Sequence, residues 1–138
     1  MNSKIQIEID LQLRYLWLGF GYALLVALAV LSLIPGPDIG VNDKLMHFLA
    51  YGLLSGWFSL IVRYPRSLWL VFFGLTGFGL LMEYLQGLTS YRMPDIGDAV
   101  ANGLGVLLGM ASRFSPLRRI MAKVDERLHA LFYAAGSN

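Results

Sequence analysis

Four long apolar runs, separated by short polar breaks, set the pattern of this chain. They cover residues 15–34, 45–62, 67–86 and a last run that starts at Asp95 or Asp98 and ends at Ser112. A helix rises about 1.5 Å per residue, so runs of this length suit a hydrocarbon core about 30 Å thick. The pattern predicts an all-α fold, an integral membrane bundle of four transmembrane helices.

Proline and glycine mark the first break. Pro35-Gly36-Pro37 ends the first run, because proline cannot donate a backbone hydrogen bond and restricts the residue before it. A cleaved signal peptide is the alternative for this run, since Ala27-Leu28-Ala29 has the small-x-small pattern of a cleavage site. That pattern lies inside the apolar run instead of after it, so we expect a retained transmembrane helix.

The two ends of the chain differ from the apolar runs. Residues 1–14 alternate apolar and polar positions like a strand, yet some of their apolar residues also form one helical stripe, so both interpretations stay open. Residues 113–138 predict a basic amphipathic helix, a cytoplasmic tail on the membrane surface. Its apolar positions are Leu117, Ile120, Met121, Val124, Leu128, Leu131 and Phe132. We therefore predict a single domain over 1–138 with its core at 43–112.

The composition supports a membrane protein and narrows the chemistry. Of the 138 residues, 57% are hydrophobic and 14% are charged, which is unusual for a soluble domain. The chain has no cysteine, which excludes a disulfide framework, cysteine-bound zinc and a thiol nucleophile. The net charge is only +2 and the basic residues lie near the ends of the apolar runs, so we expect the lipid bilayer as a partner and not nucleic acid.

The basic residues predict the orientation of the bundle. Four spans place both termini and the loop at 63–66 on one side of the membrane, and the loops at 35–44 and 87–94 on the other. The first side carries nine lysines and arginines, whereas the second carries only Lys44 and Arg92. By the positive-inside tendency, the amino and carboxyl termini are cytoplasmic and the second side faces outward.

Three ionisable residues from three runs are expected at a similar depth. Counted from the nearest inner-face arginines at about 1.5 Å per residue, His47, Glu83 and Asp98 lie about 22–26 Å away, and Tyr51 and Asn102 lie about a turn deeper. Ionisable groups at membrane depth are costly and usually face a bundle interior or a wet cavity. The sequence therefore predicts a convergent polar pocket that opens outward.

Small residues continue the polar face of the fourth run. Gly105 and Gly109 share one helical face with Asp98 and Asn102. Such small-xxx-small spacing lets two membrane helices approach closely. We therefore expect close packing of the fourth helix to bring Asp98 and Asn102 inward.

These polar residues, taken in order, match a known pattern. The pattern consists of Asp43-Lys44, His47, Tyr51, Glu83, Gln86, Arg92, Asp95, Asp98, Asn102 and Gly103, followed by a glycine-bearing helix. In this series the chain resembles the VanZ-like family of small bacterial membrane proteins. The resemblance implies a helical protein of the bacterial cytoplasmic membrane, in a family whose founding member is linked to low-level resistance to teicoplanin, a lipid-tailed glycopeptide antibiotic. It implies no particular reaction.

Each candidate residue has both a functional and a structural interpretation. Glu83 either joins helices by a hydrogen bond or acts as a general acid or base, and His47 is its candidate acid–base partner. Arg92 either pairs with a nearby aspartate or holds a phosphate or carboxylate group. The candidate binding residues are Asp43, Lys44, Tyr51, Gln86, Arg92, Asp95, Asp98 and Asn102.

Two further expectations concern Asp95 and metals. Asp95 also fits the N-cap of the fourth helix, where a carboxylate accepts hydrogen bonds from exposed backbone N–H groups. His47, Glu83, Asp95 and Asp98 are candidate ligands of a divalent metal, but no helix offers a compact His-x-x-x-His pair, so we predict neither a metal site nor another cofactor.

Three functions remain open at this point. The first is binding of an anionic group of a lipid-linked cell-envelope precursor, or of the glycopeptide itself, in the outer leaflet. The second is an intramembrane hydrolase or transferase acting on a phosphate or acyl linkage, with Glu83 and His47 as acid and base. The third is a proton or ion path, which ranks last because only Ser55, Ser59 and Thr76 continue the polar positions inward.

Overall fold

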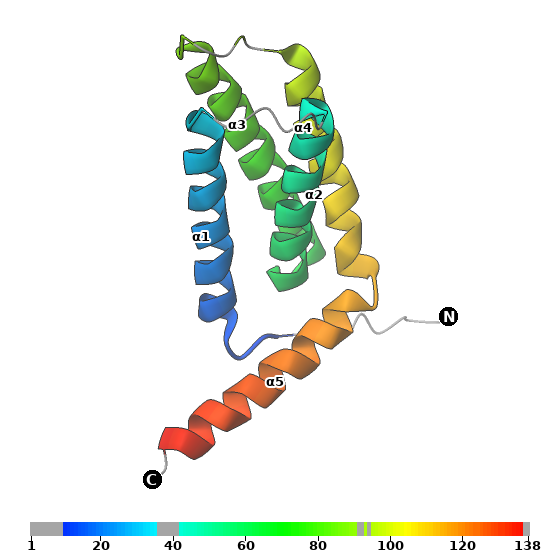
Figure 1. Ribbon diagram of the computed structural model, residues 1–138. Coiled ribbons are helices and arrows are strands. Elements are labelled where there is room, and N and C mark those ends of the chain that lie inside the picture. Colours follow the sequence, from blue (N-terminus) through cyan, green and yellow to red (C-terminus); the bar gives the residue numbers. More distant parts are fainter. Residues whose placement is uncertain (1–9, 36–41, 91–92, 94, 137–138) are drawn as a thin grey trace, which may run out of the picture.

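The computed structural model of the protein describes residues 10–35, 42–90, 93 and 95–136. The described residues form α-helices and short 3-10 helices and contain no strand, so the predicted all-α class is confirmed. The elements are α1 (Arg14–Leu33), α2 (Asp43–Ile61), η1 (Pro65–Ser67), α3 (Leu68–Gly87), α4 (Ile96–Met110), η2 (Ala111–Phe114) and α5 (Leu117–Gly136). Helices α1 to α4 stand together as a bundle, and α5 crosses obliquely below it (Figure 1).

Consecutive helices of the bundle run in opposite directions. The carboxyl ends of α1 and α3 and the amino ends of α2 and α4 lie at one end, which we call the site end (Figure 1). The amino end of α1, the turn at η1, and α5 lie at the opposite end, which we call the α5 end. This is the alternation that the sequence predicts for four antiparallel segments.

Helices α2 and α4 make the most extensive contact in the bundle. A side chain at Gly105 would collide with the backbone oxygen of Phe48, and one at Gly109 would collide with that of Gly52. The Ser55 hydroxyl also donates to the backbone oxygen of Val106 across the interface, at 2.7 Å. The predicted close packing of α4 through its glycines is therefore confirmed.

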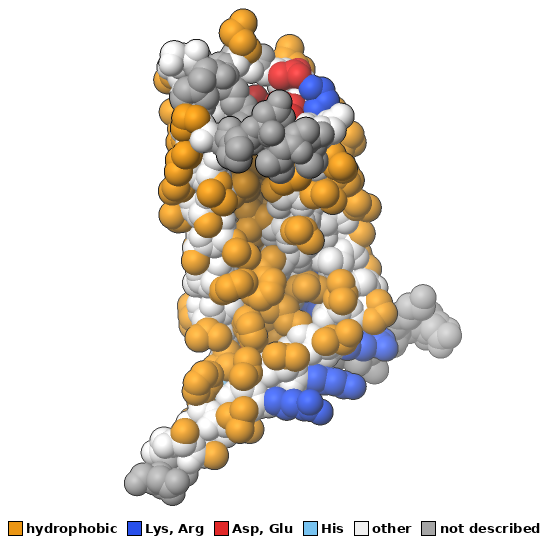
Figure 2. Space-filling model, in the orientation of Figure 1, with side chains coloured by type: hydrophobic (Ala, Val, Ile, Leu, Met, Phe, Trp, Pro, Cys, Tyr) orange, Lys and Arg blue, Asp and Glu red, His pale blue; other side chains and the backbone are white. Residues whose placement is uncertain are grey.

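The core is small, and much of the apolar surface faces outward. A cluster of five buried side chains joins α2, α3 and α4, namely Tyr51, Leu54, Val71, Leu75 and Val106. By contrast, Leu31, Leu53 and Leu70 are each more than 70% exposed. Hydrophobic side chains cover the side of the bundle between its two ends, and lysines and arginines gather along α5 (Figure 2). Apolar surface of this extent is typical of a protein that contacts lipid or another protein.

By length and apolar composition, two helical segments qualify as candidate membrane spans, not four. They are α1 and the segment Pro65–Gly87, which joins η1 and α3. Helix α4 has 15 residues, and a helix of that size is only about 22 Å long, which is shorter than a typical hydrocarbon core. Helix α2 is less apolar because it carries Lys44 and His47 near its start. The coarser prediction of a helical bundle holds, whereas four separate long apolar spans are not found.

A carboxylate from α5 holds the amino end of α1. Asp125 is almost fully buried and accepts hydrogen bonds from the backbone N–H groups of Gln12 and Leu13, at 2.6 and 3.0 Å. Its Oδ1 atom also accepts from the Trp17 indole N–H at 2.6 Å. The first turn of a helix leaves its backbone donors without partners inside the helix. Asp125 therefore fixes α1 to α5; of the open segment 1–14, residues 1–9 lie outside the described part of the chain.

The carboxyl end of α2 is satisfied by arginines from the chain that follows α4. Arg113, which is buried, donates to the backbone oxygens of Val62 and Arg63. Arg118 donates to the Val62 oxygen at 3.3 Å. Burial lowers the pKa of both guanidinium groups below the usual range, but an arginine stays protonated at neutral pH. Arg113 and Arg118, at the α5 end, therefore cap the carboxyl end of α2.

Candidate functional site

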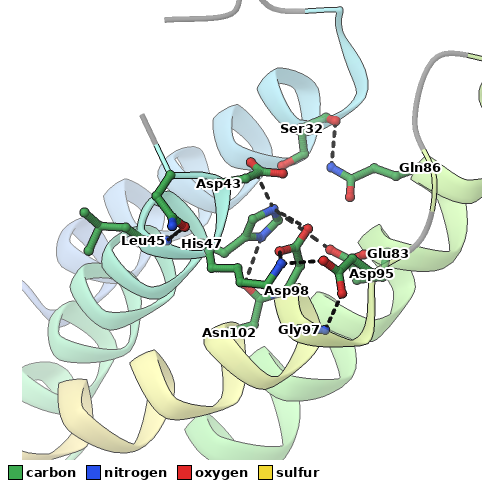
Figure 3. A network of polar contacts seen from close by, with 12 residues as sticks. Ser32, Asp43, Leu45, His47, Glu83, Gln86, Asp95, Gly97, Asp98 and Asn102 are labelled. Carbon is green, nitrogen blue, oxygen red and sulfur yellow. Dashed lines mark hydrogen bonds and ion pairs between the residues drawn. The ribbon is translucent and has the colours of Figure 1, made fainter. Parts of the chain in front are cut away.

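Polar side chains from three helices meet at the site end of the bundle. The first turns of α2 supply Asp43 and His47, the end of α3 supplies Glu83, and the start of α4 supplies Asp98 and Asn102 (Figure 3). We call these five residues the polar cluster. Close packing of α4 on α2 through glycines is what brings Asp98 and Asn102 to His47. The convergence that the sequence predicts is therefore observed.

His47 lies at the centre of the polar cluster. Its Nδ1 atom is 3.0 Å from the side-chain oxygen of Asn102. An amide oxygen only accepts, so His47 Nδ1 carries a proton and donates it. The Nε2 atom then faces carboxylate oxygens of Asp43, Asp98 and Glu83, at 3.8, 3.8 and 4.0 Å. Asn102 thus sets the orientation of the ring, with Nε2 directed toward the carboxylates.

The polar cluster is closed toward the bundle core and reaches the surface at one residue. The side chains of His47, Glu83 and Asp98 are only 6–10% exposed, whereas that of Asp43 is 57% exposed. Asn102 is buried as well. A ligand that approaches the cluster would therefore meet Asp43 first.

Lys44 links the cluster to the start of α4. Its Nζ atom pairs with Asp95 and lies 3.5 Å from Asp98 Oδ1. The hydrogen bond to Asp95 raises the pKa of Lys44 above its usual range. The same bond, helped by a second from the Gly97 N–H, lowers the pKa of Asp95. Because Asp95 accepts from Gly97 N–H at 2.7 Å, it also caps α4 as predicted.

Two of the predicted binding residues lie beside the cluster and not in it. Gln86 donates from Nε2 to the backbone oxygen of Ser32, at 2.9 Å, and so ties α3 to α1 (Figure 3). Tyr51 is buried on α2, one helical turn from His47 toward the bundle core. Its hydroxyl has no hydrogen-bond partner within the described part of the chain. The predicted anion-binding Arg92 lies outside the described residues.

The place of Asp43 in a group that suits a metal ion was missed by sequence reasoning. Asp43, His47 and Asp98 offer ligand atoms that all lie within 4.8 Å of one another. The sequence suggested His47 and Asp98 as ligands, together with Glu83 and Asp95, but a metal site was not predicted because no helix carries a His-x-x-x-His pair. The signal was an aspartate four residues before a histidine, which places both on one face of α2.

Comparisons with known proteins give little further information. No family model matches this chain, and no solved structure matches it. An uncharacterized protein of the fission yeast Schizosaccharomyces pombe is 33% identical to it over 105 residues, in a match that covers 73% of this chain. The chain spans 64% of the length of that relative. The similarity indicates common ancestry with a fungal protein and assigns no activity.

Proposed function

We propose that this chain is an integral membrane protein of the VanZ-like type, with α1 to α4 inserted in the bilayer and α5 on its surface. The arrangement of the surface supports this proposal, since an apolar band separates a polar cluster at one end from basic residues at the other (Figure 2). Within α1, only Gly21 is buried, whereas the core helix of a soluble protein would be mostly buried. Helix η2 extends the short α4 toward the α5 end.

Contacts between α1 and its neighbours support a retained helix in place of a cleaved signal peptide. A side chain at Gly21 would collide with Trp57 and Phe58 of α2. The Trp57 indole N–H donates to the backbone oxygen of Trp17 at 3.1 Å. These contacts, with the bond from Gln86 to α1, make the first helix part of the bundle.

The proposed orientation puts the α5 end in the cytoplasm and the site end outside. It rests on the excess of lysines and arginines at the α5 end. The bacterial cytoplasmic membrane is proposed from the family resemblance alone, and the fungal relative does not favour it.

The polar cluster is proposed to receive the polar head group of a lipid-linked or lipophilic molecule, such as an envelope precursor or a glycopeptide. The single observation that carries this proposal is a nearly buried cluster of His47 and carboxylates that opens at Asp43, near the exposed Leu45 and Met46 of α2. The polar cluster contains three carboxylates and one histidine, and the neighbouring Lys44 already pairs with Asp95. Direct binding of an anionic group is therefore less favoured by the geometry than binding through a hydroxyl, an amine or a cation.

An intramembrane hydrolase or transferase is the second candidate function. It is favoured by the orientation of His47, whose Nδ1–H is held by Asn102 while Nε2 faces Glu83 and Asp98. In this candidate, Nε2 takes a proton from water or a substrate hydroxyl that attacks a phosphate or acyl linkage, and Glu83 returns a proton to the leaving oxygen. A proton path is supported least, because the Ser55 hydroxyl below the cluster already donates to Val106.

The proposed function is tested by antibiotic susceptibility. A sensitive Gram-positive host would express the wild type, Glu83→Gln, His47→Ala or the control Glu126→Gln, with membrane levels matched by immunoblot. We expect a raised teicoplanin threshold, an unchanged vancomycin threshold, and a weakened effect in the two site variants only. If Glu83 is a general acid or base, Glu83→Gln should lose roughly 10²-fold or more of the activity. If Glu83 only lines a binding pocket, the loss of activity should be modest. No shift with inserted wild-type protein would contradict the proposed link to glycopeptides.

A further inference from the structure

The carboxylates around His47 are spaced in an unusual way. Their oxygens lie 3.8–4.0 Å from His47 Nε2, which is beyond the usual hydrogen-bond range of about 2.7–3.2 Å. Two ligands that each lie about 2.0–2.2 Å from a shared metal ion are about 3.0–3.6 Å apart. The ligand atoms of Asp43, His47 and Asp98 lie within 4.8 Å of one another, so a contraction of up to about 1 Å would turn this spacing into a coordination shell.

The orientation of His47 also fits a metal ligand. A histidine that binds a metal through one nitrogen almost always donates its other N–H to a carbonyl, carboxylate or water. Here Nδ1 donates to the Asn102 side-chain oxygen at 3.0 Å, which leaves Nε2 to face the carboxylates. Asn102 is buried and lies one helical turn beyond Asp98 on α4. The same helix thus supplies a candidate ligand and the group that orients the histidine.

The two oxygens of Asp98 are divided between two neighbours. Oδ1 lies 3.5 Å from Lys44 Nζ, and Oδ2 lies 3.8 Å from His47 Nε2. Lys44 therefore holds the carboxylate from the outside while its second oxygen faces the centre of the cluster. The side chain of Asp98 is only 6% exposed, so the surrounding helices restrict its position.

We propose that Asp43, His47 and Asp98 bind one divalent cation, with Glu83 beside the site at 4.0 Å from His47 Nε2. One imidazole, two carboxylates and no sulfur suit Zn²⁺ or Mn²⁺. The ion would join α2 and α4 at the site end. It would also supply the positive charge that a phosphate or carboxylate head group needs in an acidic cluster; that role rests on the proposed function, whereas binding of the ion does not.

Metal content of the purified protein tests this site directly. The full chain in detergent would be stripped with a chelator, dialysed against Zn²⁺ or Mn²⁺, and analysed by mass spectrometry of the metal. We expect one ion per chain, at least 10-fold weaker binding in Asp98→Asn and His47→Gln, and 10–100-fold weaker binding in Asn102→Ala. Glu126→Gln, which removes an exposed carboxylate on α5, should bind like the wild type. Less than one-tenth of an ion per wild-type chain would overturn the proposal.

A spectroscopic readout keeps the test independent of variant folding. Pulsed electron paramagnetic resonance of bound Mn²⁺ should show coupling to one imidazole nitrogen. The chain has two histidines, so His129→Gln should keep this coupling. Its absence in the wild type, or its loss in His129→Gln, would overturn the assignment to His47. Because no lipid or antibiotic enters these measurements, a failure here is distinct from a failure of the susceptibility test.

Discussion

At the scale of single residues, the position of Asp125 shows what a helical pattern leaves out. The sequence predicts a basic amphipathic helix over 113–138 and assigns no particular role to Asp125. In the structure Asp125 is 1% exposed and accepts three hydrogen bonds from α1 and the residues before it. The pattern describes only one helix, whereas the partners of this carboxylate lie more than 100 positions away in the sequence.

We expect Asp125→Asn to destabilise the protein. An amide offers one acceptor oxygen where three N–H donors converge, so at least one buried donor loses its partner, at a cost of about 1–3 kcal/mol. Thermal unfolding in detergent would measure the change. The neighbouring Glu126→Gln is the matched control, because a substitution at an exposed position usually stays within about 0.5 kcal/mol. Equal unfolding temperatures for the two variants would contradict the role of Asp125.

The candidate site was predicted in part. Counting residues from the inner-face arginines placed His47, Glu83 and Asp98 in one layer, and the structure brings these three together. Counting gives height along a helix but only an approximate rotation about its axis. For that reason the sequence assigned Gln86 to the pocket, whereas its amide bonds to Ser32. The functional roles of all these residues stay predictions.

At the scale of helices, the contact between α2 and α4 determines the geometry of the site. Gly105 faces backbone atoms of Phe48 and Gly52 with no room for a side chain. Backbone atoms cannot move aside as the tip of a flexible side chain can. Any residue larger than glycine at this position would therefore push α4, and with it Asp98 and Asn102, away from His47.

We expect Gly105→Ala to lower the free energy of unfolding by about 1–3 kcal/mol, the usual cost of overpacking. Gly103→Ala is the matched control on the same helix, since nothing lies within 4 Å of the added methyl group. That change should stabilise the helix by up to about 1 kcal/mol, because alanine has the higher helix propensity. Chemical or thermal unfolding in detergent would measure the stability of both variants. Stabilisation by both substitutions would contradict close packing at Gly105.

The bounds of the helices were largely predictable from the apolar runs. The runs at 15–34 and 45–62 correspond to α1 (Arg14–Leu33) and α2 (Asp43–Ile61). Proline and charged residues end these runs sharply, so local sequence carries the information. The length of α4 was harder to predict, because Asp95 and Asp98 both fit a helix start and the last turn continues as η2. Asp95 proves to be the cap.

At the scale of the whole molecule, the proposed topology places α5 and the site end on opposite sides of a membrane. The chain has no cysteine, so single cysteines can be introduced without background. We expect a membrane-impermeant maleimide to label Ile96→Cys, at an exposed position at the start of α4, in intact cells. Lys123→Cys on α5 should react only after the membrane is permeabilised. The reverse pattern would contradict the orientation, and equal labelling of both in intact cells would contradict insertion.

The hydrogen bonds from α1 to Asp125 also affect the order in which the protein is made. The ribosome releases α1 first and α5 after the other described helices, so the amino end of α1 lacks its partner until synthesis has passed Asp125. A nascent chain interrupted earlier would hold a first helix whose end is not yet secured. The first helix is therefore secured only once α5 has been synthesised, so a chain interrupted before Asp125 should open more readily at this end of the bundle.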